Sequence, residues 1–143
     1  MSINGSNSED FYKYCKDQGT TLLLIKTTKN KIFGGFTPLN WEKGTRYGEE
    51  KKDLSNQTFI FSLNLLKKYD MINKDKFAKR FYSDYGPQFG NIDFALMKDM
   101  TKGVIYANQF CYFLSNNNLE LTGGKGESEE FEVDEFVVYK VTY

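Results

Sequence analysis

Two cysteines, Cys15 and Cys111, are the side chains in this sequence best suited to chemistry of their own. A reactive cysteine needs a nearby positive charge that favours its thiolate. Cys111 lies among aromatic residues, and no cation is adjacent to it in the sequence. We therefore interpret both thiols as buried and inert, and keep a redox-sensitive thiol at Cys111 or Cys15 as the alternative hypothesis.

Other common catalytic groups are missing or wrongly spaced. The chain has no histidine, which excludes serine–histidine and cysteine–histidine catalysis and removes the commonest zinc ligand. The stretch Gly123–Gly126 lacks the spacing of a phosphate-binding loop and is interpreted as a flexible turn. Four carboxylates lack the spacing of a calcium loop: Asp84, Asp93, Asp99 and Glu135. We therefore predict a protein that is not an enzyme and that holds no cofactor or metal.

Composition indicates one domain inside the cell. The chain has 143 residues, and its 19 basic and 19 acidic side chains cancel, which argues against nucleic acid or an acidic membrane as partner. No apolar window reaches the length of a membrane span, and no signal-peptide pattern is visible, so we predict no membrane insertion. With two cysteines only, we expect reduced thiols and a cytoplasmic location. We divide the chain into a short polar segment, residues 1–8, and one domain, residues 9–143.

The stretch Thr21–Phe36 predicts a β-hairpin around which the domain is organised. The first strand, Leu22–Lys26, is apolar without alternation, which predicts a central strand covered on both faces. A polar turn leads into a second strand over Lys31–Phe36. That strand contains Gly34-Gly35, which indicates a bulge or the close approach of another backbone.

A short helix is predicted just before this hairpin. Ser8 is a suitable N-cap for a helix over Glu9–Lys16, and Gly19 is a suitable stop. The helical spacing places three residues on one apolar stripe, namely Phe11, Tyr14 and Cys15.

Further β segments follow at short spacing. We predict strands at Thr58–Leu63, where Phe59, Phe61 and Leu63 share a face, and at Phe77–Tyr82, Ile92–Met97 and Phe131–Tyr143; Val104–Leu114 is a strand or a buried loop. Thr37–Gln57, Asn64–Lys76 and Ser83–Asn91 are interpreted as loops. The fold class is therefore mainly β (α+β): a two-sheet antiparallel β-sandwich flanked by one or more short helices, with a mixed α+β roll as the alternative.

Glu135 interrupts the pattern of the closing strand. Alternate residues from Phe131 to Tyr143 are apolar and share one face, and Glu135 falls on that same face. Either a bulge turns its carboxylate outward, or Glu135 is a buried acid that needs a partner such as Arg80.

The long segment Thr37–Gln57 holds the only tryptophan, Trp41. Its ring either anchors the segment on the core or lies exposed beside Arg46 and Tyr47. In the second case, the three residues form a partner-binding loop, because Trp, Tyr and Arg are the commonest hot-spot residues of protein interfaces.

Several motifs, taken in order, resemble the TLDc (TLD) domain family, which is related to oxidation-resistance proteins. They lie in Phe11–Trp41, Phe59–Leu63, Ser83–Gly90 and Phe131–Val141. The family's first strand usually precedes a turn that resembles Asn4-Gly5-Ser6, so we expect the domain to lack that strand. Either a sheet edge is then left open, or another segment takes the place of the strand.

The resemblance implies a β-sandwich flanked by helices, with no catalytic residues to carry over. It also implies protection against oxidative stress, and binding and regulation of the vacuolar proton-pumping ATPase. We therefore predict a non-enzymatic protein-interaction module, monomeric or part of a larger assembly, that presents the loops Pro38–Gln57 and Asn64–Lys76 to its partner. The alternatives are a direct thiol-based antioxidant and a structural module that accepts a strand at its open edge.

Overall fold

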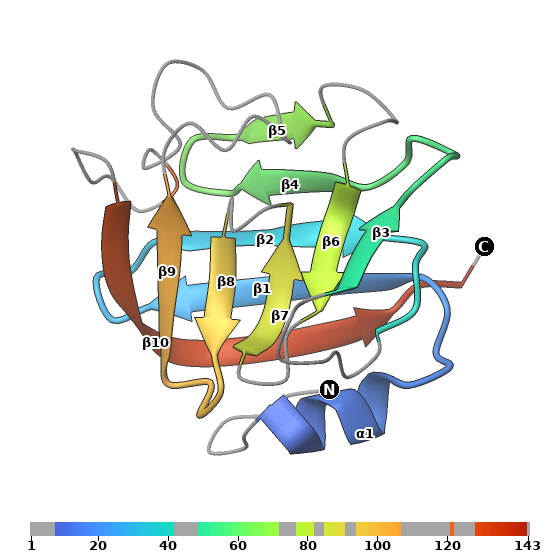
Figure 1. The fold of residues 1–143 in the computed structure, drawn as a ribbon. Helices are drawn as coiled ribbons and strands as arrows, with labels where there is room; N and C mark the ends of the chain where they lie inside the picture. The colour runs from blue at the N-terminus through green and yellow to red at the C-terminus, as the bar shows by residue number, and fades with distance from the viewer. Residues whose placement is uncertain are drawn as a thin grey trace.

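The structure, a computed structural model, describes residues 8–41, 49–71, 77–81, 85–90, 94–106, 121 and 128–142 (Figure 1). For residues 49–50, 77–81, 106 and 128 it describes the backbone alone. Helix α1 covers Ser8–Cys15. The strands are β1 (Thr21–Thr27), β2 (Ile32–Thr37), β3 (Glu49–Lys52), β4 (Phe59–Ser62), β5 (Lys67–Asp70), β6 (Phe77–Phe81), β7 (Tyr85–Phe89), β8 (Phe94–Met97), β9 (Lys102–Tyr106) and β10 (Ser128–Lys140).

The described strands form one continuous antiparallel sheet. Their order is β3-β6-β7-β8-β9-β10-β1-β2-β4-β5. The long strand β10 joins the two parts of this order, because its first residues pair with β9 and its later residues pair with β1. A mainly β fold with a short helix is therefore confirmed. The predicted division into two separate sheets is not what the hydrogen bonding shows.

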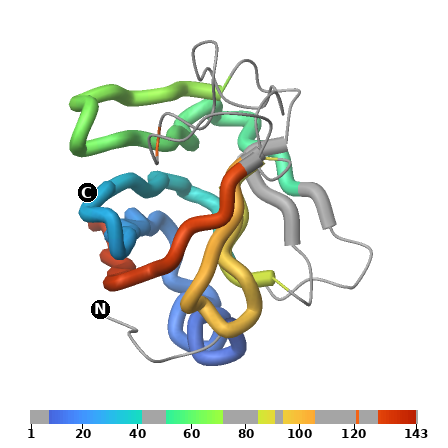
Figure 2. Tube along the Cα trace, turned by 90° about the vertical axis from the view of Figure 1, so that its left-hand side faces the viewer, coloured from blue at the N-terminus to red at the C-terminus, as the bar shows by residue number. Residues whose placement is uncertain are grey.

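This sheet curls over so that distant strands lie against each other. In Figure 1, strands β6 to β9 cross in front of β1 and β2, and Figure 2 shows the same arrangement from the side. The ring centroids of Phe33 on β2 and Phe94 on β8 are 5.4 Å apart. A Cβ added to Gly35 would lie 2.3 Å from the ring of Phe89 on β7. A Cβ added to Gly34 would lie 1.8 Å from the backbone oxygen of Leu23 on β1. The close approach of another backbone predicted for Gly34-Gly35 is therefore confirmed at Gly34, and at Gly35 the close neighbour is an aromatic ring.

Aromatic rings fill the core between these layers. The ring centroids of Trp41 and Phe89 are 5.6 Å apart, and Phe89 stacks on Phe94 at 5.0 Å. Edge-to-face and offset contacts of this kind stabilise a core beyond the burial of area. The largest fully buried side chains include Trp41, Phe11, Phe33, Phe89, Phe94 and Phe136.

Strand β1 is central, as predicted, but its two faces are unequal. It pairs with β10 on one side and with β2 on the other. Leu23 and Ile25 are fully buried, whereas Leu22 and Leu24 are only half-buried. The prediction that both faces are covered is therefore wrong for the outward-facing leucines.

Helix α1 packs on β7 through a different stripe from the predicted one. Phe11, Tyr12 and Cys15 are buried, but Tyr14 is 51% exposed. The Tyr12 hydroxyl lies 3.1 Å from the Gly86 carbonyl oxygen, to which it donates, so β7 selects this face of the helix. Gly19 has the left-handed conformation expected after a helix, with φ of 72°. No described helix has the length and apolarity needed to cross a membrane.

Three strands lie in segments that were predicted as loops, namely β3, β5 and β7. Strands β3 and β5 end the sheet order and have charged sequences, EEKK and KKYD, that give no apolar alternation. Charged residues are common on edge strands because they discourage pairing with other chains. Strand β7 contains Pro87, and its register with β8 shifts between Tyr85 and Gln88, which removes the need for a proline N–H in the ladder.

Candidate protein-interaction surface

Trp41 is an anchor of the core. Its ring is fully buried, and its Nε1 donates a hydrogen bond of 2.9 Å to Thr21 Oγ1. The ring packs edge-to-face against Phe11 at a centroid distance of 5.3 Å. The anchor alternative is therefore confirmed, and the indole ring does not face a partner. Arg46 and Tyr47, the other residues of the predicted partner-binding loop, lie outside the described residues.

Cys15 is buried at the end of α1. Its side chain is 2% exposed, and it lies near Tyr12. Burial raises the pKa of the Tyr12 hydroxyl, and a negative charge on Cys15 would raise it further. Cys111 lies outside the described residues, so thiol reactivity stays a prediction for both cysteines. Cys15 also lines a hollow of about 260 Å³, together with Tyr14, Gln18, Thr21, Val138 and Lys140.

Glu135 is exposed next to a bulge in β10. In the ladder between β1 and β10, Lys26 lies opposite Glu135, whereas the next residue of β1, Thr27, lies opposite Val133. Asp134 is therefore an extra residue in β10. The bulge alternative is therefore confirmed, and the buried-acid alternative is wrong. The extra residue also reverses the faces of the strand, so Phe136 and Val138 enter the core and Tyr139 is exposed.

Because of this reversal, an apolar surface forms on the side of the sheet that points away from the core. The strand registers place these outward side chains in two rows that cross β10, β1, β2 and β4. We call this surface the outer face. Its first row is Tyr139, Leu22, Phe36 and Phe59, and its second row is Val137, Leu24, Gly34 and Phe61.

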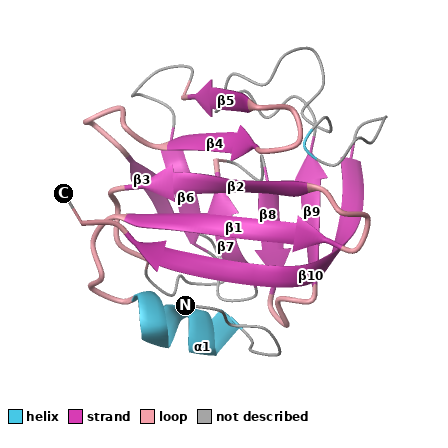
Figure 3. Cartoon of the chain, turned by 180° about the vertical axis from the view of Figure 1, so that it is seen from behind, coloured by secondary structure: helices cyan, strands magenta, loops and turns pink. Residues whose placement is uncertain are grey.

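Seen from behind, β10, β1, β2 and β4 lie side by side, and no other labelled helix or strand crosses in front of them (Figure 3). The side chains of the outer face are half-buried, apart from Tyr139, which is 48% exposed. An antiparallel sheet with one solvated face usually carries polar residues there. A contiguous apolar patch in such a position is typical of an interaction site.

Contacts within the outer face hold its side chains in place. The rings of Phe36 and Phe59 stack at a centroid distance of 5.1 Å. The Lys68 Nζ lies 4.5 Å from the centre of the Phe59 ring. A Cβ on Gly34 would lie 3.1 Å from the Phe61 ring, so this ring covers the glycine. The surface is therefore preorganised, which lowers the entropic cost of binding.

The segment that leads into β4 is also fixed. The Asp53 carboxylate accepts hydrogen bonds from the backbone N–H groups of Gln57 and Thr58, at 2.9 and 2.7 Å, and from the hydroxyl groups of Ser55 and Thr58. Burial raises the pKa of Asp53, but the hydrogen bonds outweigh it and hold the pKa below its usual value. The end of the predicted presenting loop Pro38–Gln57 is thus part of a rigid turn.

The outer face was not predicted because both faces of β1 were expected to be covered, and the face shared by Phe59, Phe61 and Leu63 was assigned neither to the core nor to the solvent. In β4 the buried residues are Ile60 and Ser62, whereas Phe59 and Phe61 point outward and Leu63 is 48% exposed. The sequence contained a useful signal: the alternate residues of this segment, Thr58, Ile60 and Ser62, include the smaller side chains.

Among the described residues, no group of three acidic or cysteine side chains is placed to hold a metal ion.

A mainly β domain with a preorganised apolar sheet face has the features of a protein-interaction module. The chain belongs to the TLDc domain family, whose model matches residues 1–142. The predicted resemblance is therefore confirmed over nearly the whole chain.

Individual relatives match shorter parts. TBC1 domain family member 24 from Xenopus laevis is 33% identical over 61 residues, which are 42% of this chain and 11% of the relative. The Xenopus tropicalis protein of the same name matches to the same extent. MTOR-associated protein MEAK7 from Danio rerio is 39% identical over 49 residues, or 34% of this chain and 10% of the relative. This chain therefore spans only a small part of the length of these relatives.

Proposed function

We propose that this chain is a non-enzymatic TLDc-type module of the cytoplasm that binds a protein partner through the outer face. The proposed partner is a subunit of the vacuolar proton-pumping ATPase, which the module would regulate during oxidative stress. The observation that carries the proposal is the apolar outer face on a chain of this family.

The composition of the outer face supports a protein partner. Aromatic residues are enriched at the centres of protein interfaces, and charged residues are depleted there. The two rows contain four aromatic side chains, Tyr139, Phe36, Phe59 and Phe61, and no charge. Tyr139 is both apolar and able to form a hydrogen bond, which suits it to the centre of such an interface.

Strand addition at a sheet edge is less favourable. The two ends of the described sheet order are β3 and β5, each four residues long and each with two lysines. Short edges with lysine resist pairing with another chain. The MEAK7 relative is named as an mTOR-associated protein, which supports binding to a protein partner as the role of this module.

Affinity capture from the source cell, with the intact chain as bait, tests the proposal. We expect vacuolar ATPase subunits in the capture, identified by mass spectrometry. Tyr139→Glu should abolish their recovery, because it places a charge in the first row of the outer face. The matched control is Leu54→Glu, which changes a leucine that is 74% exposed in the turn after β3 and should keep the partner.

Two results would contradict the proposal. Equal recovery of the ATPase by the parent chain and by Tyr139→Glu would remove the outer face from the interaction. Recovery of no ATPase subunit, together with rapid modification of Cys15 or Cys111 in a thiol titration, would favour the thiol-based antioxidant instead.

A further inference from the structure

The turn between β4 and β5 carries three exposed leucines. Leu63, Leu65 and Leu66 are 48%, 43% and 87% exposed, respectively. They lie at the ends of the strands, beyond the two rows of the outer face. We call these three residues the leucine turn. Three neighbouring leucines with this exposure form an apolar tip that folding alone does not bury.

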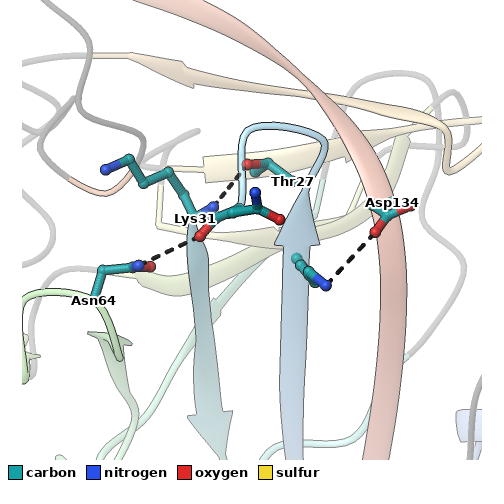
Figure 4. A network of polar contacts seen from close by, with 6 residues as sticks. Thr27, Lys31, Asn64 and Asp134 are labelled. Atoms are coloured by element: carbon teal, nitrogen blue, oxygen red, sulfur yellow. Dashed lines mark hydrogen bonds and ion pairs between the residues drawn. The ribbon is translucent and has the colours of Figure 1, made fainter.

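Asn64 fastens this turn to the neighbouring β1–β2 turn. Its Oδ1 accepts a hydrogen bond from the N–H of Ile32, and its Nδ2 donates one to the carbonyl of Asn30 at 3.3 Å. The Leu63 N–H also donates to the Ile32 carbonyl at 2.9 Å. Figure 4 shows Asn64 beside the polar contacts of the β1–β2 turn. The two turns therefore form one fixed tip.

Leu66 has a backbone conformation that leucine disfavours. Its φ is 54°, in the left-handed region that glycine and asparagine adopt more readily. Burial does not compensate for this conformation, because Leu66 is the most exposed large apolar residue among those described. A strained and exposed leucine is thus unfavourable for folding and points to a role in binding.

Lysines surround the leucine turn. The β1–β2 turn, the β4–β5 turn and the first two residues of β5, which together are residues 28–31 and 63–68, contain four lysines and no acidic residue: Lys29, Lys31, Lys67 and Lys68. Lys68 pairs with Asp70 at 3.1 Å. Lys29 lines a hollow of about 360 Å³ together with Glu129, Glu130 and Glu132. Even with these acids nearby, the tip itself is basic although the whole chain has no net charge.

We propose that the leucine turn docks on an anionic lipid bilayer. The leucines would enter the boundary between head groups and acyl chains, and the lysine ammonium groups would contact the lipid phosphates and carboxylates. Leucine is under-represented among protein hot spots, and lysine is depleted at protein interfaces. Leucine flanked by lysine is instead typical of segments that lie at a membrane surface. This site adds a second ligand to the proposed function and leaves the outer face accessible.

Co-sedimentation of the full chain with vesicles tests this proposal. We expect binding to phosphatidylcholine vesicles that contain about 30% phosphatidylserine, and little binding to phosphatidylcholine alone. Added salt should weaken the binding because it screens the lysine charges.

Leu66→Asn is the decisive variant. It should lower the partition coefficient roughly tenfold, because it removes the most exposed leucine from the bilayer. Asparagine accepts a φ near 54°, so the variant should fold at least as stably as the parent. Leu54→Asn, at a leucine that is 74% exposed in the turn after β3, is the matched control and should bind like the parent.

The contribution of charge is tested with Lys31→Gln and Lys67→Gln. Each variant should lower the partition coefficient about fivefold, as expected for one basic residue near an anionic surface. The control Lys16→Gln changes the residue directly after α1 and should have no such effect, because α1 and the strands β4 and β5 lie at opposite ends of the molecule (Figure 1).

Several results would overturn the proposal. One is equal binding of the parent chain to vesicles with and without phosphatidylserine, and another is unchanged binding by Leu66→Asn. Loss of a captured protein partner in Leu66→Asn, without any loss of vesicle binding, would make the turn a protein contact. The Tyr139→Glu variant should keep full vesicle binding, so failure of the lipid site and failure of the proposed function can be told apart.

Discussion

The inner and outer faces of β1, β2 and β4 have similar apolar residues in very different surroundings. On the inner face, Leu23, Phe33 and Ile60 are fully buried under the strands of the second layer. On the outer face, Leu24 and Phe61 are only half-buried, and their contacts run sideways along the sheet. The comparison shows that an apolar residue in a strand is not sufficient evidence for a core position. A residue on a strand face that another layer covers contributes to the core, whereas a residue on an uncovered face is available for binding.

The largest expected effect compares one ring from each face. Phe33→Ala should lower the free energy of unfolding by about 3–5 kcal/mol, because it leaves a cavity among buried rings. Phe61→Ala should cost only about 1 kcal/mol, since its ring contacts cross-strand neighbours and solvent. Urea denaturation of both variants measures the difference. Equal losses would mean that the two faces are buried alike.

Gly35→Ala tests how tightly the inner face is closed. The added methyl group would lie 2.3 Å from a ring atom of Phe89, which is held between Trp41 and Phe94. Because these rings are fully buried, we expect a loss of about 2 kcal/mol from overpacking. Thermal or urea unfolding measures this loss. A neutral effect would show that the layers separate easily.

A substitution of Asp53 tests the polar end of the inner face. The Thr58 hydroxyl group, which donates a hydrogen bond to the Asp53 carboxylate, lies with its oxygen 3.1 Å from the hydroxyl oxygen of Thr37. Asp53→Asn should cost about 2 kcal/mol at neutral pH, because an amide nitrogen faces the donors that the carboxylate accepts from. The pKa of Asp53 is lowered in the folded protein, so its ionised form stabilises the fold above the usual pKa of about 3.9.

This contribution is lost as the pH falls through the folded-state pKa of Asp53, because the folded protein must then take up a proton. The difference in stability between parent and Asp53→Asn should be largest above pH of about 5 and should shrink below about 4. Urea denaturation across this range measures it. A difference that does not vary with pH would contradict the lowered pKa.

Lys68→Met should have the smallest effect of this series. It removes a cation that lies 4.5 Å from the Phe59 ring centre and pairs with Asp70 at the exposed edge. Exposed contacts of this kind contribute about 0.5 kcal/mol, and methionine keeps part of the apolar contact. Unfolding at low and high salt measures the change. A loss larger than that of Phe61→Ala would place Lys68 among the main stabilisers of the outer face.

The sequence by itself determined the features that depend on local chemistry and on motifs in order. These features are the TLDc family, the mainly β class and the central position of β1. The sequence left two alternatives open for Glu135 and two for Trp41, and the structure decided for the bulge beside Glu135 and for the anchoring of Trp41. For these two residues the sequence only favoured an outcome, because a charged residue on an apolar face favours a bulge and a large ring favours burial.

Only the tertiary structure decided which face of each strand is buried and which segments become edge strands. One extra residue, Asp134, reverses the faces of β10, and the curled sheet places β7 and β8 over one side of β2. Strands β3 and β5 form because a neighbouring strand supplies hydrogen-bond partners, although their own charged sequences give no apolar pattern. The leucine turn is exposed for the same reason: contacts between residues far apart in the chain, which no local pattern contains, determine where a side chain points.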